Sequence, residues 1–183
     1  MDRLTRILTS AACAFGAVLA IACGNDITAP PVPESLEPFT VAPAAELRCE
    51  PQPRAAASAR IGPSGGTLRT GRHLLRIPAG ALKNTVAITM VSPSDTLNYV
   101  VFGPEGLTFD TALPPILTMS YRHCPGAIRY PGPLEIVYVD DALTNVLETT
   151  QLVSADTLSQ IVNAELRHFS TYLLKKSRYA VAY

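Results

Sequence analysis

Short apolar or alternating runs separated by turn signals are the feature that most constrains the fold of this chain. The clearest runs are four to six residues long and rich in β-branched side chains: residues 74–77, 86–91, 116–121 and 134–139. Segments with Pro or Gly separate them: residues 63–66, 78–80, 103–106, 114–115 and 131–133. Runs of this length, type and spacing predict β-strands joined by turns.

Less regular runs extend the pattern toward the C-terminus, over residues 145–153, 159–166, 169–174 and 179–183. The only segment that resembles a helical turn is residues 78–82. Seven or more short strands without amphipathic helices between them predict an all-β, antiparallel β-sandwich rather than a parallel α/β sheet.

The composition excludes a nucleic-acid-binding class. The chain has 183 residues, which suits one domain with appendages, and its 15 Lys and Arg balance 15 Asp and Glu. Nucleic-acid binding requires clustered basic residues that displace counterions from phosphates. We therefore expect no nucleic-acid partner.

The N-terminus has the order of a secretory signal. Arg3 and Arg6 precede residues 7–22, a stretch without any charge, and small residues follow near Cys23. Such a stretch is too short to span the roughly 30 Å hydrocarbon core of a bilayer. We therefore expect residues 1–22 to be a signal peptide that is removed.

The tetrad Ala20-Ile21-Ala22-Cys23 resembles the lipobox of bacterial lipoproteins. The resemblance implies cleavage before Cys23 and attachment of palmitate-type acyl chains to that cysteine, which would anchor the protein to a membrane. Gly24 after this cysteine favours the outer membrane of the bacterial cell envelope. The alternative is a secreted or periplasmic protein cleaved near Ala20 or Ala22.

A proline-rich tether is predicted between the anchor and the folded domain. Residues 24–58 hold seven of the sixteen prolines and show no periodicity. Proline favours extended polyproline II structure and removes hydrogen-bond donors. We expect residues 23–58 to form a disordered tether and residues 59–183 to form the sandwich.

The four cysteines fit an exported chain. Cys13 lies in the signal peptide and Cys23 is the lipidation candidate, which leaves Cys49 and Cys124. An even remainder in an oxidising compartment predicts one disulfide between them, and two free buried thiols are the alternative.

The sequence offers no clear metal site. His73, His123 and His168 lack the short spacing of zinc ligands, and a disulfide would remove Cys124 as a ligand beside His123. We expect three separate surface histidines, no metal and no cofactor.

Four motifs resemble the ZU-five domain, named for zonula occludens proteins and netrin receptors. They are Gly-Gly-Thr-Leu at 65–68, Ile-Pro-Ala-Gly-Ala-Leu at 77–82, Gly-Pro-Glu-Gly-Leu-Thr-Phe at 103–109, and His-Phe-Ser at 168–170 with Tyr-Ala-Val at 179–181. The resemblance covers about residues 61–183. It implies a β-sandwich that acts as an interaction module.

In some relatives of that family a His-Phe-Ser triplet undergoes self-cleavage. By this resemblance the Ser170 hydroxyl would attack the Phe169 carbonyl, with His168 as base, and the chain would release a 14-residue tail. The alternative is a strand in which Phe169 points inward while His168 and Ser170 point outward. We expect this second arrangement, and therefore no enzyme.

Three functions follow from these patterns. The first is a lipid-anchored, non-catalytic sandwich that presents edge strands or loops to a protein or a surface glycan. The second is a self-processing domain cut between Phe169 and Ser170. The third is a carbohydrate-binding sandwich, which the absence of Trp and the 7% aromatic content disfavour.

Overall fold

The computed structural model describes residues 46–129 and 132–177. The predicted signal peptide, Cys23, most of the tether and the run at 179–183 lie outside the described residues. No helix in the described part of the chain is long and apolar enough to cross a bilayer.

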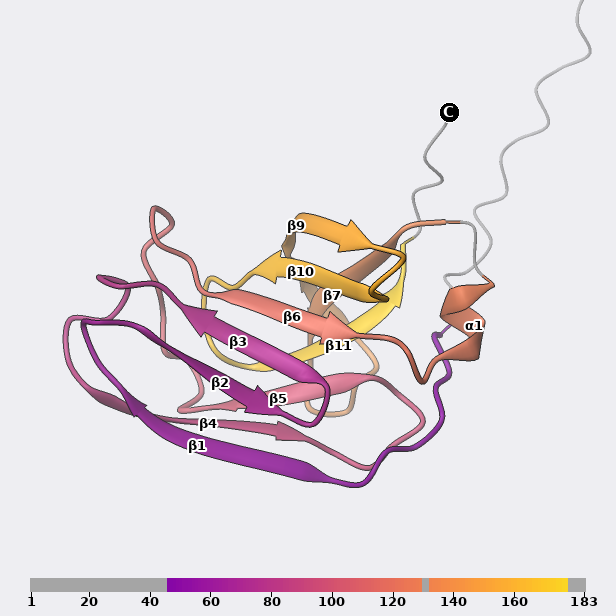
Figure 1. The fold of residues 1–183 in the computed structure, drawn as a ribbon, viewed down its shortest axis with the longest axis horizontal. Helices are drawn as coiled ribbons and strands as arrows, with labels where there is room; N and C mark the ends of the chain where they lie inside the picture. Colours follow the sequence, from indigo (N-terminus) through magenta and orange to yellow (C-terminus); the bar gives the residue numbers. More distant parts are fainter. Residues whose placement is uncertain (1–45, 130–131, 178–183) are drawn as a thin grey trace, which may run out of the picture. The chain divides into compact units, whose positions relative to one another are not determined.

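Two antiparallel sheets pack against each other (Figure 1). The six-stranded sheet has the order β1 (Ala55–Ile61), β4 (Val86–Ser92), β5 (Tyr99–Gly103), β11 (Thr171–Lys176), β7 (Leu134–Val139) and β8 (Val146–Thr149). The five-stranded sheet has the order β2 (Gly66–Thr70), β3 (His73–Ile77), β6 (Ile116–Ser120), β10 (Ile161–Glu165) and β9 (Gln151–Asp156). The predicted all-β, antiparallel sandwich is confirmed.

The core lies between the sheets and follows the two-residue alternation of the strands. In β4, Ile88 and Met90 are fully buried while Ala87 and Thr89 are exposed. In the facing sheet, Leu117 of β6 is also fully buried. Period-two apolar patterning therefore places one face of each sheet in the core.

A second, smaller apolar cluster covers the outer face of the six-stranded sheet. Val137 and Val139 of β7 and Leu173 of β11 form its floor, and Leu97 and Leu143 pack onto them from neighbouring loops. Because Leu134 and Ile136 of β7 belong to the main core, β7 is buried on both faces. Loops thus cover part of a face that an antiparallel sheet can leave open to solvent.

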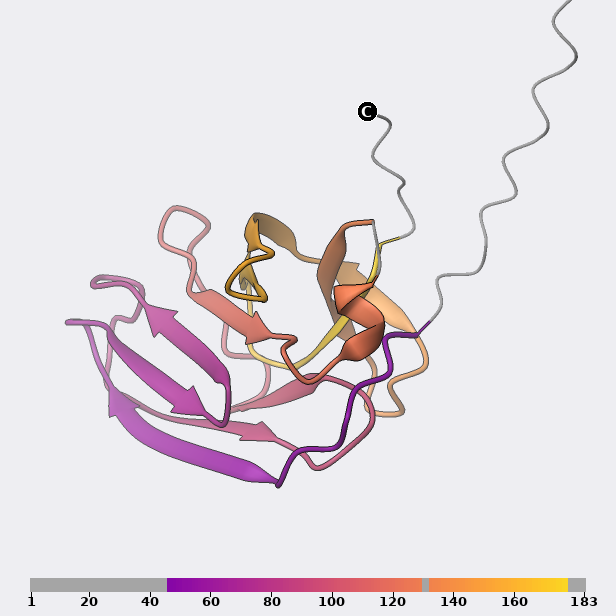
Figure 2. The same ribbon diagram turned by 45° about the vertical axis from the view of Figure 1, so that its right-hand side comes forward.

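The predicted domain boundary at residue 59 is too late. β1 begins at Ala55, and Leu47 is 1% exposed in the core. Residues 46–54, which we call the strap, lead into β1 close to α1 (Pro125–Ile128), as Figures 1 and 2 show. The alanines of β1 resembled tether composition, yet they alternate between half-buried and exposed positions in register with β4.

The helical turn predicted at 78–82 is absent, and these residues form turns and a bend. Gly80 has φ of 85°, which belongs to the left-handed region and ends any helical turn there. Within the described residues the helix is α1, which begins with Pro125 at its first position.

Candidate functional site

Exposed apolar side chains gather on β8, β9 and the turn that follows. Seven large hydrophobic residues are exposed in the described part of the chain, and five of them fall within residues 146–158. We call these five the apolar edge: Val146, Leu147, Leu152, Val153 and Leu158. Such a concentration marks an interaction surface more often than scattered exposed residues do.

The apolar edge arises because the chain changes sheets at Thr150. A single strand was predicted over residues 145–153, but β8 ends the six-stranded sheet and β9 ends the five-stranded sheet. Thr150 fixes the corner, since its N–H and its Oγ1 donate to the Ile136 carbonyl at 3.2 and 2.6 Å. Two edge strands therefore lie next to each other in the chain.

A β-bulge interrupts each of these edge strands. The register of β8 on β7 passes from Glu148 to Val146, and the register of β9 on β10 passes from Ser154 to Leu152. Leu147 and Val153 are the residues left unpaired, and they are 54% and 50% exposed. Because a bulge redirects a side chain and is a typical feature of functional edges, both positions point to recognition.

The opposite edges of the two sheets are protected differently. β1 carries the exposed Arg60 and β2 carries the exposed Arg69. Residues 146–156 contain two acidic residues but no Lys, Arg or Pro. Basic residues discourage strand pairing on that side, whereas the apolar edge has the short strand β8 and two bulges instead.

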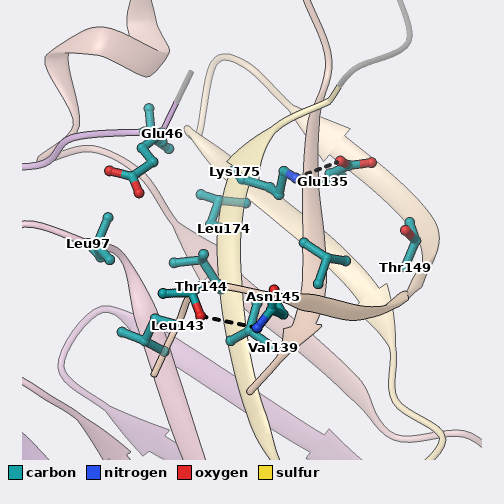
Figure 3. A pocket seen from close by; sticks show the side chains of 13 residues that line it. Glu46, Leu97, Glu135, Val139, Leu143, Thr144, Asn145, Thr149, Leu174 and Lys175 are labelled. Atoms are coloured by element: carbon teal, nitrogen blue, oxygen red, sulfur yellow. Dashed lines mark hydrogen bonds and ion pairs between the residues drawn. The ribbon is translucent and has the colours of Figure 1, made fainter. Parts of the chain in front are cut away.

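A groove of about 540 Å³ lies beside β8 on the outer face of the six-stranded sheet (Figure 3). We call it the outer groove. Val139, Leu143 and Leu173 supply apolar lining, and Val146 joins the groove to the apolar edge. The groove can therefore receive side chains from anything bound along β8.

Each carboxylate of the outer groove has a cationic partner. Lys175 Nζ lies 4.0 Å from Glu135 Oε1 (Figure 3), and Glu46 Oε2 lies 2.5 Å from the Arg48 guanidinium. The Lys175 and Glu135 side chains are 13% and 17% exposed, so this ion pair is weakly screened by water. The groove therefore offers an apolar floor with a charge-balanced rim.

Asp140 organises the loop that forms one wall of the outer groove. Its Oδ1 accepts hydrogen bonds from the N–H groups of Thr144 and Asn145 at 2.8 and 3.1 Å, and its Oδ2 accepts from Asn145 Nδ2 at 2.7 Å. The bonds from Asn145 and Thr144 lower the pKa of Asp140. This carboxylate therefore shapes the groove as an anion.

The His-Phe-Ser triplet lies against the loop between β5 and β6. The Phe169 N–H donates to the Leu107 carbonyl at 2.8 Å, and the Gly106 N–H donates to the Phe169 carbonyl at 2.9 Å. The Phe169 ring is fully buried, with its centroid 4.9 Å from the rings of both Phe102 and Phe109. The predicted inward position of Phe169 is confirmed.

The flanking residues of the triplet do not both face outward. His168 Nε2 lies 3.6 Å from Glu148 Oε2, and its ring packs edge-on against Tyr138. Ser170 is buried, contrary to the prediction, because residues 166–170 form an irregular crossing instead of a strand. Across residues 46–129 and 132–177, no hydrogen bond joins the His168 imidazole to the Ser170 hydroxyl.

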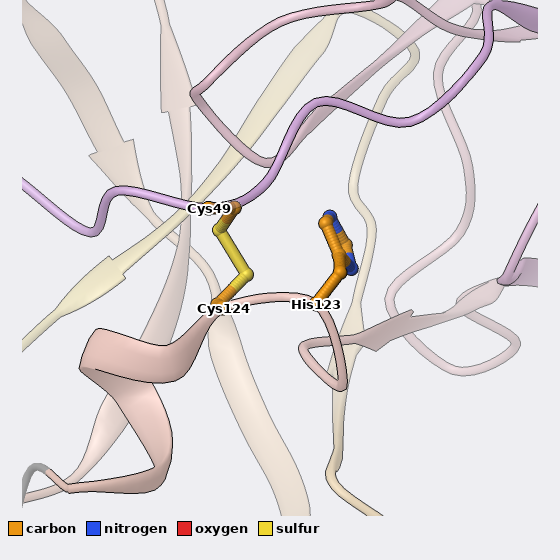
Figure 4. Close-up of side chains that lie close together, drawn as sticks. All are labelled: Cys49, His123 and Cys124. Carbon is orange, nitrogen blue, oxygen red and sulfur yellow. A yellow bond between two sulfur atoms is a disulfide. The ribbon is translucent and has the colours of Figure 1, made fainter.

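The predicted disulfide between Cys49 and Cys124 is confirmed, and it joins the strap to the residue before α1 (Figure 4). His123 lies beside it, and the two sulfur atoms and an imidazole nitrogen lie within 4.8 Å of one another. Sulfur atoms joined in a disulfide are not thiolates and do not ligate metal as such. In this form the cluster is a covalent link rather than a metal centre.

The prediction of three surface histidines is wrong for His73, which is 3% exposed. Its Nδ1 accepts a hydrogen bond from the N–H of Ser120 at 3.3 Å. No pattern near His73 in the sequence indicates this, because Ser120 lies 47 residues away.

Comparison with known proteins gives no family assignment. No protein-family model matches the chain, and no curated protein matches it.

Proposed function

We propose that this protein is a non-catalytic interaction module, exported and anchored to a membrane through Cys23, that binds an extended segment of a protein partner at the apolar edge. The observation that carries the proposal is the exposure of Leu147 and Val153 at bulges in two neighbouring edge strands. The resemblance to the ZU-five domain, whose members act as interaction modules, points in the same direction.

Strand addition is the recognition mode that suits this surface. In the part of the chain that the structure describes, β8 pairs only with β7 and β9 pairs only with β10. Each strand thus offers main-chain donors and acceptors along its second side. An added strand gains affinity from main-chain hydrogen bonds and specificity from pockets that receive alternate side chains.

The outer groove defines the chemistry of the bound segment. Val146 and Thr149 of β8 line the groove, so side chains of a strand added beside β8 would lie next to it. Its apolar floor accepts a branched aliphatic side chain, while the alternate side chains of an added strand would face water. We therefore propose an extended partner segment that alternates aliphatic and polar residues.

The location of the module follows from its N-terminal segment. The uncharged stretch 7–22 and the tetrad that ends at Cys23 support export and lipid anchoring at the bacterial outer membrane. The prolines between Gly24 and the strap support a semi-rigid tether that holds the sandwich away from the bilayer.

The alternative functions find less support in the geometry. Self-cleavage requires a base at the Ser170 hydroxyl, whereas the His168 imidazole lies against Glu148 and Tyr138. Carbohydrate binding uses exposed aromatic rings, whereas Phe102, Phe109, Phe169 and Tyr172 are buried.

A tryptophan-labelled peptide tests strand addition directly, because the protein contains no Trp and gives no background in tryptophan emission. The probe is a peptide of about eight residues that alternates Val with Lys and carries one Trp, long enough to pair with one edge. Saturable binding with a blue shift of the emission is expected. A peptide of the same sequence with alternate amides N-methylated should not bind, because it lacks donors for the main-chain ladder.

Matched variants locate the binding. Leu147→Lys on β8 should weaken binding by about tenfold or more, as expected for loss of a central apolar contact, and Val153→Lys on β9 should weaken it less. Leu113→Lys is the control, since Leu113 is also exposed but lies outside the apolar edge. Equal binding of the N-methylated peptide, an equal loss in Leu113→Lys, or no binding of the probe would contradict the proposal.

A further inference from the structure

A second hollow, of about 390 Å³, lies apart from the apolar edge. It is enclosed by the strap, the turn between β2 and β3, the loop between β4 and β5, and His123. We call it the histidine pocket. Its volume falls within the range of small-molecule sites in proteins.

Buried polar groups line the histidine pocket. His73 and Asn98 are each 3% exposed, and Asn98 Nδ2 donates to the Ser120 carbonyl at 2.9 Å. Because His73 Nδ1 accepts from the Ser120 N–H, the proton of the neutral ring resides on Nε2 and makes that atom a donor. The hydrogen bonds to the Ser120 main chain therefore hold the His73 and Asn98 side chains in place at the pocket.

His123 contributes a polar atom without a protein partner. Its Nδ1 is buried and has no hydrogen bond among the described residues. Because this nitrogen is shielded from solvent, a ligand in the hollow would contact other atoms of the His123 ring.

The charges around the pocket are predominantly positive. Arg54 and Arg72 line it, whereas Asp95 is the only carboxylate that does so, and its Oδ1 already accepts from the Leu97 N–H at 3.0 Å. Burial, together with nearby His123 and Arg72, lowers the pKa of His73 to about 4. Burial and Arg72 also lower the pKa of His123, against an opposing effect of Glu50. At neutral pH the lining side chains therefore carry a net charge of +1.

We propose that the histidine pocket binds a small organic monocarboxylate. The carboxylate would accept hydrogen bonds from Arg72 and from His73 Nε2, and it would lie beside the His123 ring. Its apolar body would lie against Leu97 and the Pro53 and Pro93 rings, which also line the hollow. One negative charge matches the net charge of the lining, which disfavours phosphate as the ligand. This site does not depend on strand capture at the apolar edge.

Benzoate is a suitable probe, with benzyl alcohol as an uncharged control of similar shape. The chain has three histidines, so the imidazole Cε1–H signals in proton NMR report the two pocket rings separately, and His168 serves as an internal reference. Benzoate should shift the His73 and His123 signals saturably and leave the His168 signal in place. Benzyl alcohol and inorganic phosphate should produce no saturable shift.

Two arginine variants complete the test. Arg72→Gln should weaken benzoate binding by about tenfold or more, which corresponds to the loss of a charge-assisted hydrogen bond. Arg69→Gln should bind as the wild type does, because Arg69 is exposed on neighbouring β2 and does not line the pocket. An unchanged His168 signal in both variants reports that the fold is retained. Equal shifts with benzyl alcohol, equal shifts at His168, no effect of Arg72→Gln, or no response to benzoate would overturn the proposal.

Discussion

Removal of the disulfide between Cys49 and Cys124 should destabilise the sandwich by about 4.5 kcal/mol. The crosslinked residues are 75 positions apart, and closing a loop of that length lowers the conformational entropy of the unfolded chain by the corresponding amount. The double variant Cys49→Ala with Cys124→Ala tests this value, because replacing both cysteines leaves no unpaired thiol. Chemical reduction of the wild type provides an independent comparison.

Urea unfolding followed by far-UV circular dichroism measures the loss. The denaturant dependence of the unfolding free energy should also become steeper, because an unfolded chain without the crosslink exposes more surface. A loss below about 1.5 kcal/mol would refute the loop-entropy reasoning. Hydrogen exchange would then identify the cause of such a small loss. The Glu50 amide donates to the His123 carbonyl at 2.7 Å, and fast exchange at this amide would show that the strap detaches locally.

Three further predictions concern the core, the buried histidine and the triplet. Phe169→Ala should cost about 3–5 kcal/mol in urea unfolding because it empties a site between two aromatic rings, and Phe169→Leu should cost clearly less. Since the pKa of His73 falls from 6.5 to about 4 on folding, the unfolded chain binds more protons than the folded chain between these two pH values. The free energy of unfolding should therefore fall by an amount on the order of 3 kcal/mol as pH is lowered through this window. Above pH 6.5 it should stay level. His73→Gln should flatten that dependence in unfolding curves measured across the window, and an unchanged pH profile would contradict the assignment to His73. Intact mass spectrometry should give the same C-terminus for wild type and Ser170→Ala, whereas a wild-type chain that ends at Phe169 would establish self-cleavage.

Local patterning was sufficient to predict the sandwich, and elimination among four cysteines was sufficient to predict the disulfide. The runs at 86–91 and 116–121 were predicted as strands, and Ile88, Met90 and Leu117 within them are buried because a strand with one buried face has a two-residue period. β1 was missed because small alanines give little contrast between a half-buried strand and a tether.

The candidate sites were harder to predict because they depend on contacts between distant parts of the chain. The residues adjacent to Thr150 do not indicate a change of sheet, because the hydrogen-bond partner of Thr150 is the Ile136 carbonyl on another strand. His73 likewise takes its buried environment from Ser120 and His123. Val146 and Leu152 fell within the run at 145–153, and only the order of the strands shows that they lie at an edge.

An exposed apolar edge strand can also cause aggregation. The bulges help to distinguish aggregation from recognition of a partner segment. An open-ended fibril requires a long, regular ladder, but β8 has four residues and the bulges at Leu147 and Val153 interrupt both registers. A short partner segment can still pair on one side of a bulge and place its side chains in the outer groove. The bulges therefore disfavour unlimited self-pairing but still permit pairing with a short, matched strand. This difference is the physical reason for proposing that the apolar edge serves recognition.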